Sequence, residues 1–488
     1  MHIEVRNRPA DGSEDHTEET GERGPAAGGA RDRSVEHVDL MVAAGAVATM
    51  DERRRIIRDG AVAVRGTDIV AVGKRADLLA RYRPGELIDA PGALLTPGLI
   101  DAHHHPASGY LLRGQVDERP RQYRLTELVV PHESTVTADE ARVASLASLT
   151  ELLRHGTTTF VDAGGPFPVD TAQAAAEVGI RGVLAQQTSD LAGSFARDVP
   201  DAAAMLAAAD AAFDQVDGMA GGRLRAFYCL DEPSSVSDEL VRGVVARVRE
   251  RDTGLVGHFI APPSGSPNAQ LSRYADLGVL DLHPLLAHIG WLSSEDVELF
   301  ARSGAAAVHC PSASVLGGSG FVSHGVIPEL VEAGAEVLIG TDSAAIGRFL
   351  DLVRVMYLAA CTHKDVRRDP LLLPATSVFE MATVSAARAL GWADRIGSLE
   401  PGKAADLVVF DISGLAYTPN PFIDPVPALV YGGSGTDVTT VVVDGAVVVR
   451  DGVPTTIDVA KLVEQVDAVA GPALARIGAR RESRWPVE

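Results

Sequence analysis

The stretch TPGLIDAHHH, residues 96–105, is the clearest indication of the fold of this chain. Its apolar residues follow a Pro-Gly pair and run directly into three histidines, as in a short buried strand with polar groups at its end. Side chains two residues apart point to the same face of a strand, so His103 and His105 can face one side while His104 faces the other. An HxH pair alone is weak evidence for a metal site, so its meaning depends on the rest of the chain.

Seven further strand-like runs follow along the central region of the chain. Amphipathic stretches separate them, such as VDTAQAAAEVGI at 169–180 and SDELVRGVVARVRERD at 237–252. Because a parallel pair of strands needs a crossover connection, eight strand–helix units predict an α/β fold with a closed (β/α)8 TIM barrel. The eight predicted strands are 99–105, 157–164, 180–187, 224–231, 254–261, 282–289, 305–312 and 335–342.

Both ends of the chain carry short β-rich runs with Gly, Asp and Pro at the turns. We expect these runs to assemble into one small β-sandwich beside the barrel. The first residues contain almost no large apolar side chains and are expected to form a disordered tail. The predicted organisation is a tail (1–36), a first β-sandwich segment (37–95), the hydrolase barrel (96–395), a second β-sandwich segment (396–458) and a C-terminal helical segment (459–488).

The composition restricts the partners. Lys and Arg number 44 against 66 Asp and Glu, and the net charge of −22 disfavours nucleic acid, because phosphate binding requires a clustered basic surface. We therefore expect a small-molecule substrate. No signal-peptide pattern or membrane-spanning apolar stretch is visible, so no membrane partner is expected. Three scattered cysteines are too few for a disulfide framework, which favours a reducing cytoplasm.

Polar residues at four predicted strand ends give the HxH pair its meaning. His258 ends the fifth strand, His288 the sixth and Asp342 the eighth, and the first strand ends in the HxH pair. Barrel enzymes place their catalytic groups at this face. Single buried, hydrogen-bonded histidines are common, but their coincidence at four correct strand ends favours an active site.

The ordered set of motifs resembles the amidohydrolase superfamily, and within it the branch of cytosine deaminase, guanine deaminase and triazine hydrolase. The resemblance extends from about residue 38 to 455 and rests on TPGLIDAHHH (96–105), HGTTTFVDAG (155–164), LLAHIGWLSSEDVELFARSGAAAVHCPSAS (285–314), IGTDSAA (339–345) and ATVSAARALGWADRIGSLEPGKAADLVVFD (382–411).

The resemblance implies that His103, His105, His258 and Asp342 bind one divalent metal ion, and that His288 lies beside the activated water or the substrate. Three neutral imidazoles and a carboxylate suit zinc, with iron or cobalt as alternatives. Asp342 can accept the proton of the water and pass it to the leaving group. His288 can stabilise the charge that develops on the attacked group. The resemblance also implies a homo-oligomer.

The chain departs from this branch in its proton-transfer apparatus. Deaminases of the branch carry a glutamate three residues after the fifth-strand histidine, and this chain has Ala261 there, followed by Pro262 and Pro263. The seventh-strand SSN motif here reads Ser312-Ala313-Ser314, and the usual asparagines after the eighth-strand aspartate are replaced by Ile346-Gly347. The leading hypothesis is therefore hydrolysis of an amide, urea or carbamate-like C–N bond, as in phenylurea and thiocarbamate hydrolases.

Two alternatives stay open. One is a deaminase or dehalogenase of a nitrogen heterocycle, in which Asp231 or Glu232 replaces the missing glutamate; as a simpler interpretation, these carboxylates cap the next helix. The other is a non-catalytic barrel scaffold, which the complete ligand set disfavours. Candidate substrate-binding residues are Gln115, Asp231, Glu232 and His309.

The lysine distribution predicts a mononuclear site. Binuclear relatives commonly bridge two metals with a carbamylated lysine on a barrel strand, but no lysine occurs between Lys74 and Lys364. We expect Lys364 to lie in the helix after the eighth strand, on the outer side of the barrel. A bridge from Cys229, Asp231 or Glu232 is the remaining route to a second metal.

Overall fold

The computed structural model describes most of the chain. The described residues are 35–107, 109–120, 123–192, 199–260, 267, 269–419, 421–480 and 485–486. Nearly all of the predicted disordered tail, as well as Ala261, Pro262 and Pro263 of the fifth-strand region, lies outside them.

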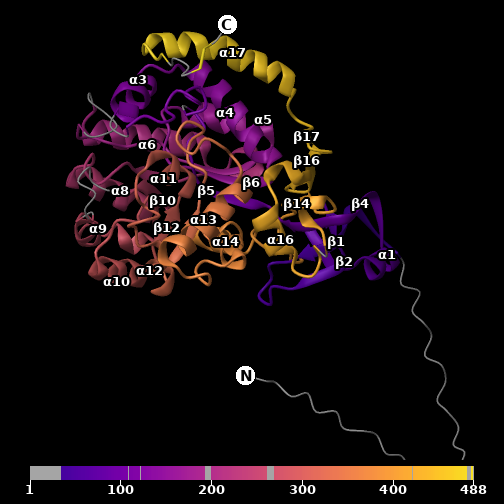
Figure 1. Ribbon diagram of the computed structural model, residues 1–488. Helices are drawn as coiled ribbons and strands as arrows, with labels where there is room; N and C mark the ends of the chain where they lie inside the picture. Colours follow the sequence, from indigo (N-terminus) through magenta and orange to yellow (C-terminus); the bar gives the residue numbers. More distant parts are fainter. Residues whose placement is uncertain are drawn as a thin grey trace, which may run out of the picture.

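Parallel strands form the centre of the molecule, in two sheets (Figure 1). One sheet has the order β5-β6-β7-β8 and the other β13-β12-β11-β10-β9, with all pairs parallel. The predicted fourth strand is divided into β8 and β9, with Phe227 between them. At the other junction the amide of Asp342 donates to the carbonyl of His103 at 2.9 Å. The strands are β5 (Leu99–His104), β6 (Thr157–Asp162), β7 (Arg181–Leu184), β8 (Leu224–Ala226), β9 (Tyr228–Leu230), β10 (Leu255–His258), β11 (Leu285–Ala287), β12 (Ala306–His309) and β13 (Glu336–Ile339).

Helices connect the parallel strands, as the alternating pattern predicts. Several of the longer ones begin at a side-chain cap: Ser237 and Ser293, for example, each accept an N–H of the first helical turn. The helices of this region are η1 (Arg124–Val129), α3 (Val130–Glu133), α4 (Ala138–Arg154), α5 (Pro168–Val178), α6 (Ala202–Val216), α7 (Met219–Gly222), α8 (Asp238–Arg251), α9 (Leu271–Asp276), η2 (Leu280–Leu282), α10 (Ser294–Ser303), α11 (Pro311–Gly317), α12 (Ile327–Glu332), α13 (Leu352–Arg367), α14 (Ala375–Met381) and α15 (Val384–Ala389).

The β-rich runs from both ends of the chain join one eight-stranded sheet, in the order β17-β16-β15-β14-β4-β1-β2-β3. β14 pairs with β4, so strands from the first and the last parts of the chain are neighbours in the middle of this sheet (Figure 1). Its elements are β1 (Glu36–Ala48), β2 (Ile56–Arg65), β3 (Asp68–Lys74), α1 (Arg75–Arg81), β4 (Tyr82–Pro97), β14 (Leu407–Asp411), η3 (Leu415–Tyr417), α16 (Pro425–Gly432), η4 (Gly435–Asp437), β15 (Val438–Val443), β16 (Ala446–Arg450) and β17 (Val453–Pro454).

A buried ion pair connects this outer sheet to the parallel strands. Arg181, the first residue of β7, donates to Asp406 at 2.8 and 3.1 Å and to Asp444 at 3.1 Å. The guanidinium of Arg181 is largely buried, and both carboxylates belong to the second half of the outer sheet. The late portion of the chain thereby contacts the amino end of a central strand, opposite the face that carries the histidines.

The C-terminal helix α17 (Val459–Arg476) lies along α4 (Figure 1). Arg476 forms an ion pair with Glu140, which also closes the capping box of α4 with Thr137. None of the helices among the described residues is long and apolar enough to span a membrane.

Candidate metal centre

The polar groups at the strand ends converge on one site. His103 belongs to β5 and His105 follows its last residue; His258 ends β10, and His288 follows β11. Asp342 lies three residues beyond β13. Parallel strands end at the same edge of the structure, which brings residues far apart in sequence together here.

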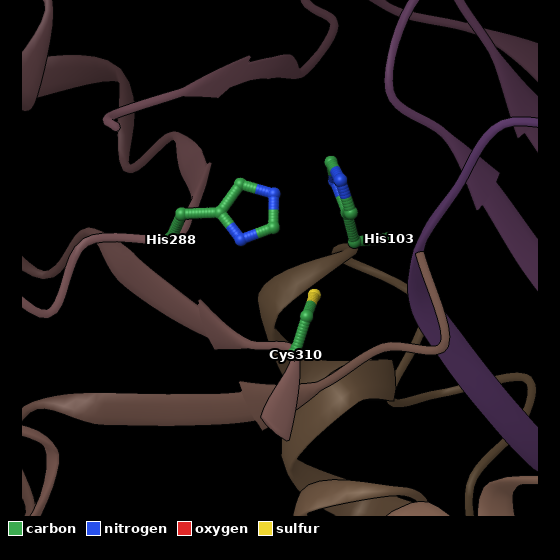
Figure 2. A group of neighbouring side chains, drawn as sticks. All are labelled: His103, His288 and Cys310. Atoms are coloured by element: carbon green, nitrogen blue, oxygen red, sulfur yellow. The ribbon is translucent and has the colours of Figure 1, made fainter. Parts of the chain in front are cut away.

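The ligand atoms of His103, His105 and His258 all lie within 4.8 Å of one another. His105 Nε2 is 3.2 Å from His258 Nε2. The carboxylate of Asp342 lies against the same group, with Oδ1 4.0 Å from His105 Nε2 and Oδ2 3.5 Å from His288 Nε2. His103 and His288 face the same space (Figure 2).

The histidines suit a metal ion. His103 Nε2 is buried and has no hydrogen-bond partner among the described residues. Burial, followed by the charges of the neighbouring histidines, holds the pKa values of His103 and His258 well below the ordinary value. Burial lowers the pKa of His105 to about 4. The imidazoles are therefore neutral near pH 7, which is the state that coordinates a metal, and the donor set of three imidazoles and one carboxylate fits a divalent ion.

Two residues of the site have a backbone conformation that is uncommon for non-glycine residues. The φ angles are 63° at His288 and 61° at Asp342, both in the left-handed region. At Asp342 the next amide, from Ser343, donates to Oδ1 at 2.5 Å. Such residues concentrate at functional sites, where the surrounding structure holds them.

A buried hydrogen-bond network holds β5 next to the residues that follow β13. Asp101 Oδ1 accepts the amides of His103 at 3.2 Å and Thr341 at 3.0 Å, and its Oδ2 accepts the hydroxyl of Thr341 at 2.5 Å. His104 points away from the cluster: its Nδ1 lies 2.7 Å from the carbonyl oxygen of Asp342, and its Nε2 lies 2.5 Å from Ser148 Oγ. The network sets the spacing between His103 and Asp342.

The cluster opens into a cavity of about 960 Å³, including its open mouth. The walls combine apolar and ionisable side chains from loops that follow the strands. Besides the residues of the cluster, they include Leu112, Arg124, Leu125, Val129, Glu133, Gln187, Asp231, Ile260, Ser314, Phe321 and Ile346.

Among the acidic residues of the wall, Asp231 lies against His258, one of the candidate metal ligands. It is 1% exposed, and its Oδ1 lies 3.7 Å from His258 Nδ1. Burial, then the charges of Glu232 and Glu133, raises the pKa of Asp231 to about 8. A carboxyl group in this environment can hold a proton near pH 7.

The other predicted substrate residues lie elsewhere. Among the described residues, the cavity lining does not include Gln115, Glu232 or His309. Glu232 accepts the hydroxyl of Ser234 at 2.8 Å. His309 is buried, with its Nε2 3.2 Å from His363 Nε2. Substrate contact by these three residues stays a prediction, and the lining of the cavity gives it no support.

Sequence reasoning missed Glu133 and Arg124 of the cavity wall. Both belong to the segment between β5 and α4, which carries no readable motif. It also assigned no role to Cys310, whose sulfur belongs to a second group of potential ligand atoms, with His103 and His288. The only signal was its position directly after His309, at the end of β12.

Comparison with known proteins gives the following similarities. The model of the amidohydrolase family matches residues 94–448. The chain is 34% identical over 426 residues to a 5-methylthioadenosine/S-adenosylhomocysteine deaminase of Desulforudis audaxviator, covering 84% of this chain and 94% of that protein. It is 30% identical over 449 residues to a 5'-deoxyadenosine deaminase of Methanosarcina mazei, covering 90% and 99%.

Two solved structures share the fold over most of their length. An adenosine deaminase from Xanthomonas campestris with bound zinc superposes with a TM-score of 0.81 and 27% identity, covering 91% of this chain and 100% of that one. An atrazine chlorohydrolase from Arthrobacter aurescens in complex with zinc gives 0.78 and 25%, covering 88% and 100%.

Proposed function

Because this chain belongs to the amidohydrolase family, and is a hydrolase of carbon–nitrogen bonds other than peptide bonds, we propose that it removes an amino group from a small nitrogen heterocycle. Adenosine derivatives with a modified 5' position are the first candidates, since the relatives above are named for them. The observation that carries the proposal is the buried carboxyl of Asp231 in the cavity wall, next to His258.

The proposal also includes the closure of the barrel, the set of residues that hold the metal ion and the identity of that ion. The two parallel sheets form one closed (β/α)8 barrel, since β8 follows directly on to β9 and the β5–β13 junction is hydrogen-bonded. His103, His105, His258 and Asp342 hold a single ion. That ion is zinc, as in the two solved structures. When bound, the ion supplies the Lewis acidity that activates a water molecule near neutral pH.

The side chains of the chain itself divide the remaining work. The Asp342 carboxylate accepts a proton from the attacking water and passes it to the departing amine, which leaves as ammonia. His288, 3.5 Å from Asp342, lies where it can donate a hydrogen bond to the attacked group. The Asp231 carboxyl gives its proton to the ring nitrogen beside the attacked carbon. The second proton of the water, released when the carbonyl forms and ammonia leaves, restores the Asp231 carboxyl. Deaminases of the branch carry a glutamate for this role at the position of Ala261, and the methyl group of alanine cannot transfer a proton.

Hydrolysis of an acyclic amide, urea or carbamate is the second candidate. Ala261 favours it, because an acyl carbon needs activation only at its carbonyl oxygen and no proton at a ring nitrogen. In that reaction Asp231 would only orient His258, as carboxylates near metal-bound histidines commonly do.

The test is product release by the metal-reconstituted enzyme. Adenosine, 5'-methylthioadenosine and an aminated triazine are compared with a phenylurea, a carbamate and an anilide. We expect ammonia from at least one heterocycle and faster turnover than with any acyclic compound. Asp231→Asn should lower kcat/KM by about 100-fold or more, the usual contribution of general acid catalysis. Asp238→Asn, the same change at an exposed carboxylate at the start of α8, is the matched control and should leave kcat/KM unchanged. Turnover of acyclic compounds alone would reject the deaminase in favour of the second candidate.

We also propose that the predicted domain boundaries hold, that the enzyme is a homo-oligomer and that it works in the cytoplasm. All three cysteines are free thiols, as expected in a reducing compartment. Gel filtration with light scattering tests the assembly, and a single species at monomer mass would reject the oligomer.

A further inference from the structure

Cys310 lies beside His103 and His288, two histidines of the candidate metal centre (Figure 2). Its sulfur is directed toward the space between His103 and His288 (Figure 2). One nitrogen from each of these histidines and the sulfur all lie within 4.8 Å of one another. Cys310 and His103 are both 2% exposed; His103 belongs to β5, whereas Cys310 directly follows β12.

This second group differs in chemistry from the first. His103, His105 and His258 offer three nitrogens, whereas His103, His288 and Cys310 offer two nitrogens and a sulfur. A thiolate is a soft ligand and selects soft ions over those that prefer nitrogen and oxygen. The two groups share His103, whose Nε2 has no hydrogen-bond partner in the part of the chain that the structure describes.

We propose that His103, His288 and Cys310 form a second, sulfur-containing metal position, which takes thiophilic divalent ions such as Cd²⁺ and inhibits the enzyme when occupied. The inhibitory effect rests on the proposed function, because it assumes that His103 and His288 serve catalysis. The existence of the second metal position does not rest on that function. Binding replaces the S–H bond of Cys310 with a sulfur–metal bond and releases one proton to solvent.

The two positions exclude each other. Two divalent ions sharing His103 would lie close together and repel strongly unless an anionic bridge separated them. A carbamylated lysine cannot supply the bridge: no lysine occurs between Lys74 and Lys364, and Lys364 lies on α13, hydrogen-bonded to Tyr431 at 2.6 Å. The other candidates face elsewhere: Cys229 donates to the carbonyl of Ala163, Glu232 accepts from Ser234, and Asp231 lies on the Nδ1 side of His258. A soft ion entering the sulfur-containing position therefore displaces the ion held by the three histidines.

The experiment titrates Cd²⁺ into the zinc-loaded full-length protein and records two signals. The first is the ultraviolet charge-transfer band of a cadmium–thiolate bond, and the second is zinc released to a chelating dye. We expect the band to grow in step with zinc release, with one zinc released for each cadmium bound. Absence of the band, or a full band without zinc release, would overturn the proposal.

Variants locate the sulfur. Cys310→Ser should abolish the band and weaken cadmium binding by at least about tenfold, since loss of even an indirect metal contact commonly has that effect. Cys361→Ser removes a partly exposed thiol on α13 and should retain the band. His105→Ala, which removes a ligand of the first group alone, should also retain it. A band that survives in Cys310→Ser or disappears in Cys361→Ser refutes the assignment.

A second variant covers the case in which Cys310→Ser does not fold. His288→Asn should lose the band through another ligand, and a band of full intensity there would overturn the proposal. For inhibition, each variant is compared with its own rate without cadmium, and wild type should be inhibited at a concentration at least about tenfold lower than Cys310→Ser. Equal sensitivity would refute the inhibitory role. Because the spectroscopic test needs no substrate, it stands even if the proposed reaction is wrong.

Discussion

Asp101→Ala is expected to damage both stability and the active site, although Asp101 is not a proposed metal ligand. The Asp101 side chain is fully buried and accepts the amides of His103 and Thr341 through one oxygen. An alanine leaves both buried N–H groups without an acceptor. Each such loss costs about 1–3 kcal/mol, so the free energy of unfolding should fall by about 2–6 kcal/mol. The Thr341 hydroxyl adds little, because the Asp342 carbonyl at 3.2 Å is an alternative acceptor.

The same substitution should reduce turnover, because these bonds set the distance between His103 and the segment of Asp342. A displacement of about 1 Å can lower kcat/KM by about 100-fold. Urea titration measures the stability, and initial rates at saturating metal measure the turnover.

Asp101→Asn is the matched control. Its Oδ1 can still accept both amides, and its Nδ2 can donate to the Thr341 hydroxyl, so both quantities should stay close to wild type. If Asp101→Ala is destabilised by less than about 0.5 kcal/mol, a change typical of neutral surface substitutions, the reasoning is refuted.

Three further outcomes are expected. His105→Ala and Asp342→Ala should abolish turnover in soluble, folded protein, since the core between the parallel strands consists of apolar side chains. Loss of soluble expression in both variants would contradict a purely catalytic role. Elemental analysis should give one metal per chain; two tightly bound metals, both needed for turnover, would reject the mononuclear site. Chelation should lower the melting temperature until metal is restored. Bound metal adds about 4 kcal/mol to the free energy of unfolding when free metal exceeds its Kd by about 1,000-fold. Glu140→Gln should lower stability by about 1 kcal/mol near neutral pH. Burial raises the pKa of Glu140, but hydrogen bonds from Arg476 and Thr137 outweigh it and hold the pKa below its ordinary value. The contribution is therefore present above about pH 4.3, the ordinary value, and is lost as the pH falls through the lowered pKa. In urea titrations, equal destabilisation by Glu140→Gln above about pH 4.3 and below the lowered pKa of Glu140 would contradict this assignment.

Local patterns in the sequence were sufficient to predict the site's main residues. Side chains alternate along a strand, so the spacing of His103 and His105 predicts a shared face without knowledge of the fold. Strand ends of a parallel sheet lie at one edge, so His258, His288 and Asp342 could be assigned to the same place from their positions in the repeat. The structure brings all five together.

The cavity wall could not be predicted in the same way. Gln115 and Glu232 look as polar in the sequence as Asp231, yet only Asp231 lines the cavity among the described residues. Glu133 reaches it from the short helix α3. Loop conformation depends on contacts between segments distant in the chain, and no local periodicity encodes it.

Three features could be predicted from the order of the residues alone: the alternation of strands and helices, the joining of β-rich segments from the first and last parts of the chain, and the identity of the polar residues at the strand ends. Hydrophobic periodicity and strand alternation are local properties, so they are visible in the order of the residues alone. Only the tertiary structure decided that Asp231 approaches His258, that His288 and Asp342 adopt left-handed backbone conformations, and that the Cys310 sulfur lies beside His103. Each of these depends on how strands far apart in sequence pack side by side, and close packing of the interior sets those distances.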